Sequence, residues 1–193
     1  MPRKLFFGWP VFLGALLFAV LGVKGELQII SRAEWKAKPA VEQMTPLELP
    51  AQRVIIAHTA GNECKSKAAC SAEMRNIQNF HMTKAFFDDI AYNYLIGNDG
   101  NVYEGRGWKY QGAIAKGINA GSINIAFMGV FNNQLPSQAA LDVVKLLLDK
   151  LKTDQKLKED YKIFGHRQLS PTVSPGDALY AEIQTWPKWS KDL

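Results

Sequence analysis

A run of β-branched and small apolar residues near position 55 constrains the fold of this chain most. Pro50 precedes the run, which spans residues 53–57 and reads Arg-Val-Ile-Ile-Ala. A continuous apolar run, without the alternation of a strand that has one wet face, is typical of a strand covered on both faces. The sequence therefore predicts an α/β domain in which helices flank a central sheet.

Two later segments have apolar residues at helical spacing. The first is 71–83, with Ser71 as the expected N-cap and Glu73 in the first turn. Its apolar face comprises Met74, Ile77, Phe80 and His81. The second helix begins at Pro136-Ser137 and places Leu141, Val144, Leu148 and Leu151 on one face. A last helix is expected near 176–185.

The remaining regular segments predict strands. Residues 92–96 are rich in strand formers, residues 98–101 form a strong hairpin turn, and residues 102–104 return as the partner strand. Further strands are expected within 123–131 and at 163–164. With the buried run at 53–57, these segments predict a single domain with a mixed central β-sheet flanked by helices.

The charge balance argues against a nucleic-acid partner. The formal net charge is +5, but Arg3, Lys4 and Lys24 supply three of the 23 basic residues, and no acidic residue precedes position 26. The rest of the chain has 20 basic against 18 acidic residues and no concentrated basic patch. With 47% hydrophobic and 21% charged residues, the chain can form a core and is not disordered by composition.

The first 25 residues have the pattern of a secretory signal peptide. Two positive charges lie before residue 5, and residues 11–23 carry no charge. Val23-Lys24-Gly25 supplies small residues at the −3 and −1 positions of a cleavage site. The alternative is a membrane anchor, which needs about 20 apolar residues, but Pro10 and Lys24 bound a shorter run. We expect a secreted, extracellular mature chain of residues 26–193, without a membrane anchor.

The chain has only two cysteines, Cys64 and Cys70, separated by five residues. An oxidising compartment would pair them in a disulfide that holds the loop before the first long helix. The alternative is a pair of metal ligands, but this spacing does not match zinc-knuckle motifs. We therefore expect the disulfide.

Common catalytic motifs are missing from the sequence. There is no Gly-x-Ser-x-Gly nucleophile motif and no phosphate-binding glycine loop. The three histidines are His58, His81 and His166, and His81 lies on the apolar side of its helix, where a packed or hydrogen-bonded histidine is expected. Polar loops at 59–70, 105–121 and 166–176 are expected to converge at one rim of the sheet and to form a binding site.

Several ordered motifs make the chain resemble the peptidoglycan recognition proteins, whose domain is similar to type 2 N-acetylmuramoyl-L-alanine amidases. The motifs are Ser31-Arg32-Ala33-Glu34-Trp35, residues 54–60, residues 89–96, residues 102–108, Gly165-His166-Arg167 and residues 172–176. The resemblance runs from about Ile30 to Trp189 and is strongest to the short secreted insect members of the SD type. It implies the amidase type 2 fold.

The resemblance also implies positions for the zinc ligands of catalytic family members. The first ligand position is Ala57, the second is His166, and the third, a cysteine in catalytic members, is Ser174. Tyr92 matches the catalytic tyrosine, and Thr172 matches the polar group near the third ligand. A methyl group and a neutral hydroxyl do not replace an imidazole and a thiolate. His58 does not replace Ala57, because neighbouring side chains on a strand point to opposite faces. We expect no metal, no cofactor and no amidase activity.

The same resemblance implies a peptidoglycan-binding groove. The groove residues carried over are Thr59, Tyr92, Arg106, Gly107, Trp108, Asn119, His166 and Thr172. Arg106 could equally form an ion pair within the domain. Gly107-Trp108 is similar to the pair in members that accept diaminopimelic stems, but Gly121 stands where such members often have an arginine, so the preference between diaminopimelic and lysine-type stems stays open.

The sequence as a whole predicts a non-catalytic, secreted pattern-recognition protein that binds bacterial peptidoglycan and promotes innate immune signalling. Its expected partners are peptidoglycan and another peptidoglycan recognition protein or immune receptor. One alternative is a zinc-dependent amidase. The other is an adaptor that enhances binding by a second recognition protein without tight ligand contact of its own.

Overall fold

A computed structural model describes residues 26–193 of the chain. The expected signal peptide at 1–25 lies outside these residues. Among the helices of the described part, none combines the length and apolar character that crossing a bilayer requires.

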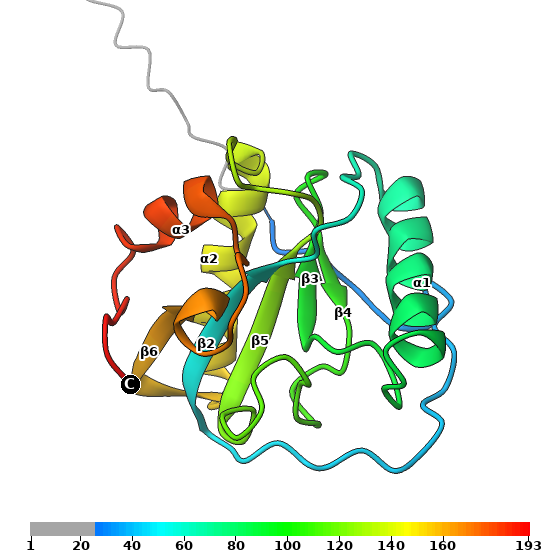
Figure 1. Cartoon of the computed structure of the whole chain (residues 1–193), viewed down its shortest axis with the longest axis horizontal. Helices are drawn as coiled ribbons and strands as arrows, with labels where there is room; N and C mark the ends of the chain where they lie inside the picture. Colours follow the sequence, from blue (N-terminus) through cyan, green and yellow to red (C-terminus); the bar gives the residue numbers. More distant parts are fainter. Residues whose placement is uncertain (1–25) are drawn as a thin grey trace, which may run out of the picture.

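The described residues form one six-stranded sheet with helices on both faces. The strands are β1 (Ile29–Ile30), β2 (Ala51–His58), β3 (Tyr94–Ile96), β4 (Val102–Glu104), β5 (Ser122–Phe127) and β6 (Leu157–Gly165). The helices are α1 (Lys67–Thr83), α2 (Gln138–Thr153), the short 3₁₀ helix η1 (His166–Gln168) and α3 (Asp177–Ile183). In Figure 1, α1 lies on one side of the sheet and α2 and α3 on the other.

The sheet is mixed, as the sequence predicts. Its spatial order is β1-β4-β3-β5-β2-β6. Only β3 and β4 are antiparallel, joined by the predicted turn, in which Gly100 has φ 80°. The other neighbouring strands are parallel, so β2, β3, β5 and β6 all end at one edge of the sheet. That edge is where loops of an α/β sheet form a site.

The two faces of the sheet carry separate apolar clusters. Val54 and Ile56 of β2 pack with α2 and α3, whereas Ala57 packs with Leu95 and the apolar face of α1. Residues 54–57 of β2 have no exposed surface. The expectation of a strand covered on both faces is therefore confirmed.

Helix α1 starts four residues earlier than its apolar pattern suggests. Its N-cap is Ser66, whose Oγ accepts a hydrogen bond of 3.3 Å from the backbone N–H of Ala69. The expected N-cap, Ser71, is instead buried within the helix. The expectation for α2 is correct, because Ser137 Oγ accepts a hydrogen bond of 3.2 Å from the backbone N–H of Ala140.

The predicted disulfide is present, with an S–S distance of 1.99 Å between Cys64 and Cys70. Cys70 lies in the first turn of α1, so the bridge ties the loop after β2 to the start of this helix.

The last strand, β6, is longer than predicted, because it begins at Leu157. Its middle is partly exposed, so only its end has the apolar pattern that predicts a buried strand.

Candidate functional site

The end of β2 places two neighbouring side chains on opposite faces of the sheet. Ala57 belongs to the cluster under α1. His58 points to the other face, where its Nδ1 accepts a hydrogen bond of 3.3 Å from the backbone N–H of Phe131. Burial, together with the positive charge of Arg167, lowers the pKa of His58. His58 is therefore a buried neutral residue that lies away from the position of Ala57.

Ser174 joins the loop after η1 to the end of β2. Its Oγ accepts a hydrogen bond of 3.0 Å from the backbone N–H of His58, and this contact is buried. The backbone N–H of Ser174 in turn donates to Thr172 Oγ1 at 3.2 Å. The hydroxyl of Ser174 thus holds two segments together, and Thr172 caps the same turn.

His166 follows β6 directly and begins η1. Ile56 of β2 pairs with Gly165 of β6. The residues that follow them, Ala57 and His166, therefore lie beside each other where the two strands end. Its Nε2 lies 2.8 Å from the backbone oxygen of Ile114. A carbonyl only accepts hydrogen bonds, so Nε2 carries a proton. Burial lowers the pKa of His166, which favours the neutral ring with a free Nδ1 acceptor.

The positions that the resemblance assigns to zinc do not provide a metal site. Ala57 has no donor atom, Ser174 Oγ is engaged with the backbone of His58, and His166 supplies a single imidazole. Within residues 26–193, no three His, Cys, Asp or Glu side chains are grouped so that they could hold a metal ion. A catalytic zinc site needs three protein ligands, and this donor set does not fit one.

A pocket of about 320 Å³ lies between α1, the segment after β2 and the segment before β3. Two predicted groove residues, Thr59 and Tyr92, line it. The sequence did not assign the other lining residues to a site: they are Ala60, Gly61, Glu73, Asn76, Ile77, Phe80 and His81. The signal that could have found them is the helical spacing of Glu73, Ile77 and Phe80, which places all three on one face of α1.

The polar groups of the pocket are neutral donors and acceptors, apart from Glu73. Thr59 Oγ1 accepts a hydrogen bond of 3.0 Å from the backbone N–H of Gly129. Burial raises the pKa of Tyr92 to about 12, so its hydroxyl keeps its proton. His81 Nδ1 accepts a hydrogen bond of 3.0 Å from the backbone N–H of Ala91, and burial lowers the pKa of His81 to about 4.

The packing of His81 agrees with the structural role that the sequence predicts. Its ring centroid lies 5.5 Å from that of Tyr92 and 5.7 Å from that of Phe87. The same side chain also forms part of the pocket wall, a position that the sequence does not predict.

Three predicted groove residues of the loop at 105–121 form hydrogen bonds within the domain. Arg106 donates through Nε to the Ile90 oxygen at 2.7 Å and through Nη1 to the Gln111 oxygen at 2.8 Å. Gly107 has φ 62°, and its oxygen accepts from Asn93 Nδ2 at 2.7 Å. Asn119 Oδ1 accepts from the backbone N–H groups of Ile114 and Ala115. These residues shape the loop beside the pocket and do not line it.

The structure places the ring of Trp108 apart from Thr59 and Tyr92. Its ring lines a separate hollow on the other face of the sheet, with Leu147 and Lys150 of α2. The ammonium of Lys156 lies 4.0 Å from the ring centroid, a cation–π contact. Gly107, which has a left-handed backbone conformation, directly precedes Trp108.

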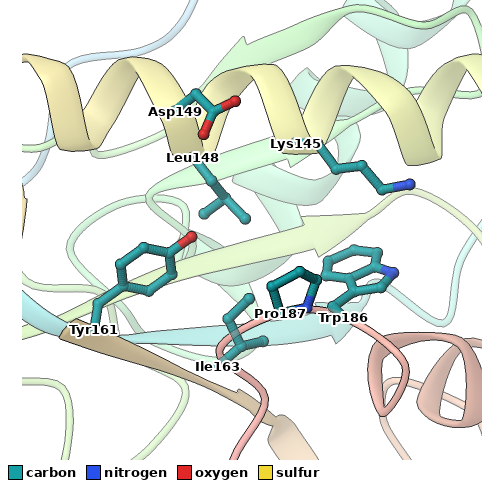
Figure 2. A pocket seen from close by; sticks show the side chains of 7 residues that line it. All are labelled: Lys145, Leu148, Asp149, Tyr161, Ile163, Trp186 and Pro187. Carbon is teal, nitrogen blue, oxygen red and sulfur yellow. The ribbon is translucent and has the colours of Figure 1, made fainter. Parts of the chain in front are cut away.

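A second hollow of about 240 Å³ on the α2 face contains no predicted groove residue. Figure 2 shows its lining side chains, which come from α2, β6 and the segment after α3. Tyr161 and Trp186 face each other across this hollow, with Leu148 above them. It is separate from the pocket beside α1.

Comparison with known proteins places this geometry among amidase-like domains. The N-acetylmuramoyl-L-alanine amidase family matches residues 47–177. Peptidoglycan-recognition protein SD of Drosophila simulans is 50% identical over 173 residues, which are 90% of this chain and 93% of that protein.

Solved structures agree with this match. The crystal structure of Drosophila peptidoglycan recognition protein SD aligns with a TM-score of 0.85 at 50% identity, over 86% of this chain and 99% of that chain. Peptidoglycan recognition protein LE, crystallised with tracheal cytotoxin, a monomeric diaminopimelic acid-type peptidoglycan, aligns with a TM-score of 0.83 at 42% identity, over 84% of this chain and 95% of that chain.

Proposed function

This chain belongs to the peptidoglycan recognition protein family, and we propose that it binds bacterial peptidoglycan without cleaving it. The observation that carries the proposal is the pocket beside α1, which Thr59, Tyr92 and His81 line. A concave site with apolar walls and a few polar groups suits a peptide stem attached to a sugar. The complex of a relative with a peptidoglycan monomer supports this ligand class.

The absence of cleavage is proposed from the donor atoms at the end of β2. Hydrolysis by a type 2 amidase would need zinc, and the residues at Ala57, His166 and Ser174 supply one imidazole and one engaged hydroxyl. His166 and Thr172 remain as polar groups near Ala57, where they can donate or accept hydrogen bonds to a bound muramyl peptide. Binding is therefore retained in this proposal, whereas water is not activated.

We further propose that the protein is secreted and acts in innate immune signalling as a pattern-recognition protein. The proposal rests on the leader pattern at 1–25, on the disulfide between Cys64 and Cys70, and on the similarity to a short insect recognition protein. Disulfides persist in oxidising compartments. Its partners would be peptidoglycan and a second recognition protein or an immune receptor.

The testing experiment is a pull-down of purified protein, residues 26–193, with insoluble diaminopimelic and lysine-type peptidoglycan. Parallel samples are analysed for zinc content and for released stem peptides. We expect retention on peptidoglycan, no stoichiometric zinc and no released peptide. Chelator-sensitive release of peptide would support the amidase alternative. Retention only in the presence of a second recognition protein would support the adaptor alternative.

A further inference from the structure

An open hollow of about 240 Å³ lies where the first residues of β2 meet the edge strand β6. This β6 hollow is lined by three basic side chains, Arg53, Lys158 and Lys162, and by one acidic side chain, Asp160. The sequence shows no basic patch here, because Arg53 lies more than 100 positions before the two lysines. Only the pairing of β2 with β6 brings them together.

The β6 hollow opens on the same face of the sheet as the pocket beside α1. Val54 of β2 and Ile163 of β6 pack in the apolar cluster on the α2 face. Neighbouring side chains of a strand point to opposite faces, so Arg53 and Lys162 point to the α1 face. The cluster under α1, as far as the structure describes it, contains no residue of β6, so this end of the face stays open.

Two positive charges face each other across the floor of the β6 hollow. Arg53 and Lys162 are direct partners in the parallel pairing of β2 with β6. Like charges at directly opposite positions of a sheet destabilise it. Within residues 26–193, the ion pairs include neither of these side chains, nor Lys158, nor Asp160. The repulsion is therefore not relieved by a carboxylate of the described chain.

The guanidinium of Arg53 is held in place by neutral groups. Its Nε donates to Ser122 Oγ at 3.0 Å, and its Nη2 donates to the backbone oxygen of Ala120 at 2.7 Å. Neither acceptor carries a charge, and among residues 26–193 no acceptor bonds its Nη1. Arg53 thus presents a fixed and uncompensated positive charge, which is the preorganised donor that an oxyanion needs.

The register of β6 changes beside the same hollow. Between the pairs Ala51–Leu157 and Arg53–Lys162, β2 advances by two residues and β6 by five. An irregularity of this kind turns side chains out of the regular alternation of a strand. It gives β6 the extra residues 158–161, two of which, Lys158 and Asp160, line the β6 hollow.

We propose that the β6 hollow is a binding site for a phosphate group. The guanidinium fork matches two phosphate oxygens, and the lysine ammonium groups add point charges around them. Three basic side chains against one acidic side chain favour an anion with more charge than a carboxylate, and a phosphate monoester carries about −1.5 to −2 at pH 7. The site is separate from the pocket beside α1, so this inference does not depend on the proposed function.

Phosphate has two sources, the free ion and the phosphate groups of a polymer, and a titration followed by NMR distinguishes them. The protein of residues 26–193 is titrated at constant ionic strength with inorganic phosphate, with a glycerol phosphate oligomer and with acetate. We expect saturable shifts of the backbone amides of Arg53 and Lys162 with a phosphate probe and none with acetate. Saturation by inorganic phosphate alone assigns the site to the free ion, and saturation by the oligomer alone assigns it to a polymer.

Two variants with opposite effects test the charges of the β6 hollow. Lys162→Gln should weaken phosphate binding by about fivefold, because it removes one exposed charge from the site. Asp160→Asn should tighten binding by about the same factor, because it removes the acidic side chain. A variant that only loosens the fold does not bind more tightly, so the second result separates a binding role from a structural one.

The matched control is Lys145→Gln, which removes the same charge from the other face of the sheet. Lys145 lies on α2, 3.9 Å from Asp142, and lines the hollow of Figure 2. This variant should keep the affinity of the wild type. Shifts that do not saturate with either phosphate probe, equal binding of acetate, or equal losses in Lys162→Gln and Lys145→Gln would overturn the inference. Each of these results leaves the proposed function intact.

Discussion

The backbone N–H of His58 donates a buried hydrogen bond of 3.0 Å to the hydroxyl oxygen of Ser174. These residues are 116 positions apart in the chain, and the bond joins the end of β2 to the loop between η1 and α3. Ser174 therefore has a structural contact at the position where the resemblance to catalytic family members implies a zinc ligand. The contact accounts for a polar residue that is only 5% exposed.

Restoring both missing donors should create a zinc site. We expect the double variant Ala57→His and Ser174→Cys to bind near-stoichiometric zinc, because His166 already lies beside Ala57 where β2 and β6 end. Each single variant should bind zinc at least about tenfold more weakly, because two protein ligands hold the ion poorly. Elemental analysis and competition with a chromophoric chelator measure this. Stoichiometric zinc in the wild-type protein would contradict the proposed absence of a metal.

The positions of Phe80 and Trp108 predict opposite results for two aromatic truncations. Phe80→Ala should weaken binding of a muramyl peptide by about tenfold, since loss of an aromatic contact costs about 1–3 kcal/mol. Trp108→Ala should change the affinity by less than about twofold, because its ring lies on the α2 face. Titration calorimetry provides both values. A large loss for Trp108→Ala with no loss for Phe80→Ala would reverse this assignment.

His81 should make the domain less stable in mild acid. Burial depresses its pKa from 6.5 to about 4 in the folded state. The unfolded chain therefore binds this proton first, and stability present above pH 6.5 is lost as the pH falls toward 4. As the pH falls from 6.5 to 4, we expect the free energy of unfolding of His81→Gln to decrease by about 1–3 kcal/mol less than that of the wild type. Urea unfolding at a series of pH values measures the difference, and parallel curves for the two proteins would contradict it.

Reduction of the disulfide should lower the stability of the domain by about 2 kcal/mol, because the bridge closes a short loop of the unfolded chain. The bridge between Cys64 and Cys70 is the only disulfide, and the described chain has no free cysteine. Urea unfolding of the oxidised protein and of the reduced, alkylated protein gives the two free energies. An unchanged midpoint would show that the packing of α1 alone holds this loop.

Local patterns were sufficient for much of the fold. The uninterrupted apolar run of β2, the apolar face of α2 and the turn around Gly100 each depend on periodicity or on backbone conformation within a few residues. The orientation of His58 also follows from local geometry, because strand neighbours alternate between faces. The disulfide follows from a count of two cysteines and the compartment that the leader pattern implies.

Long-range packing decided the rest. The sequence could not show that Trp108 turns to the α2 face, because this depends on Gly107 and on Lys156, which lies 48 positions away and contacts the ring at 4.0 Å. Nor could it show that Glu73 lies in a pocket wall, because helical spacing places a residue on a face without saying what that face meets. The pocket exists because packing brings the segment after β2, one face of α1 and Tyr92, which precedes β3, to one place.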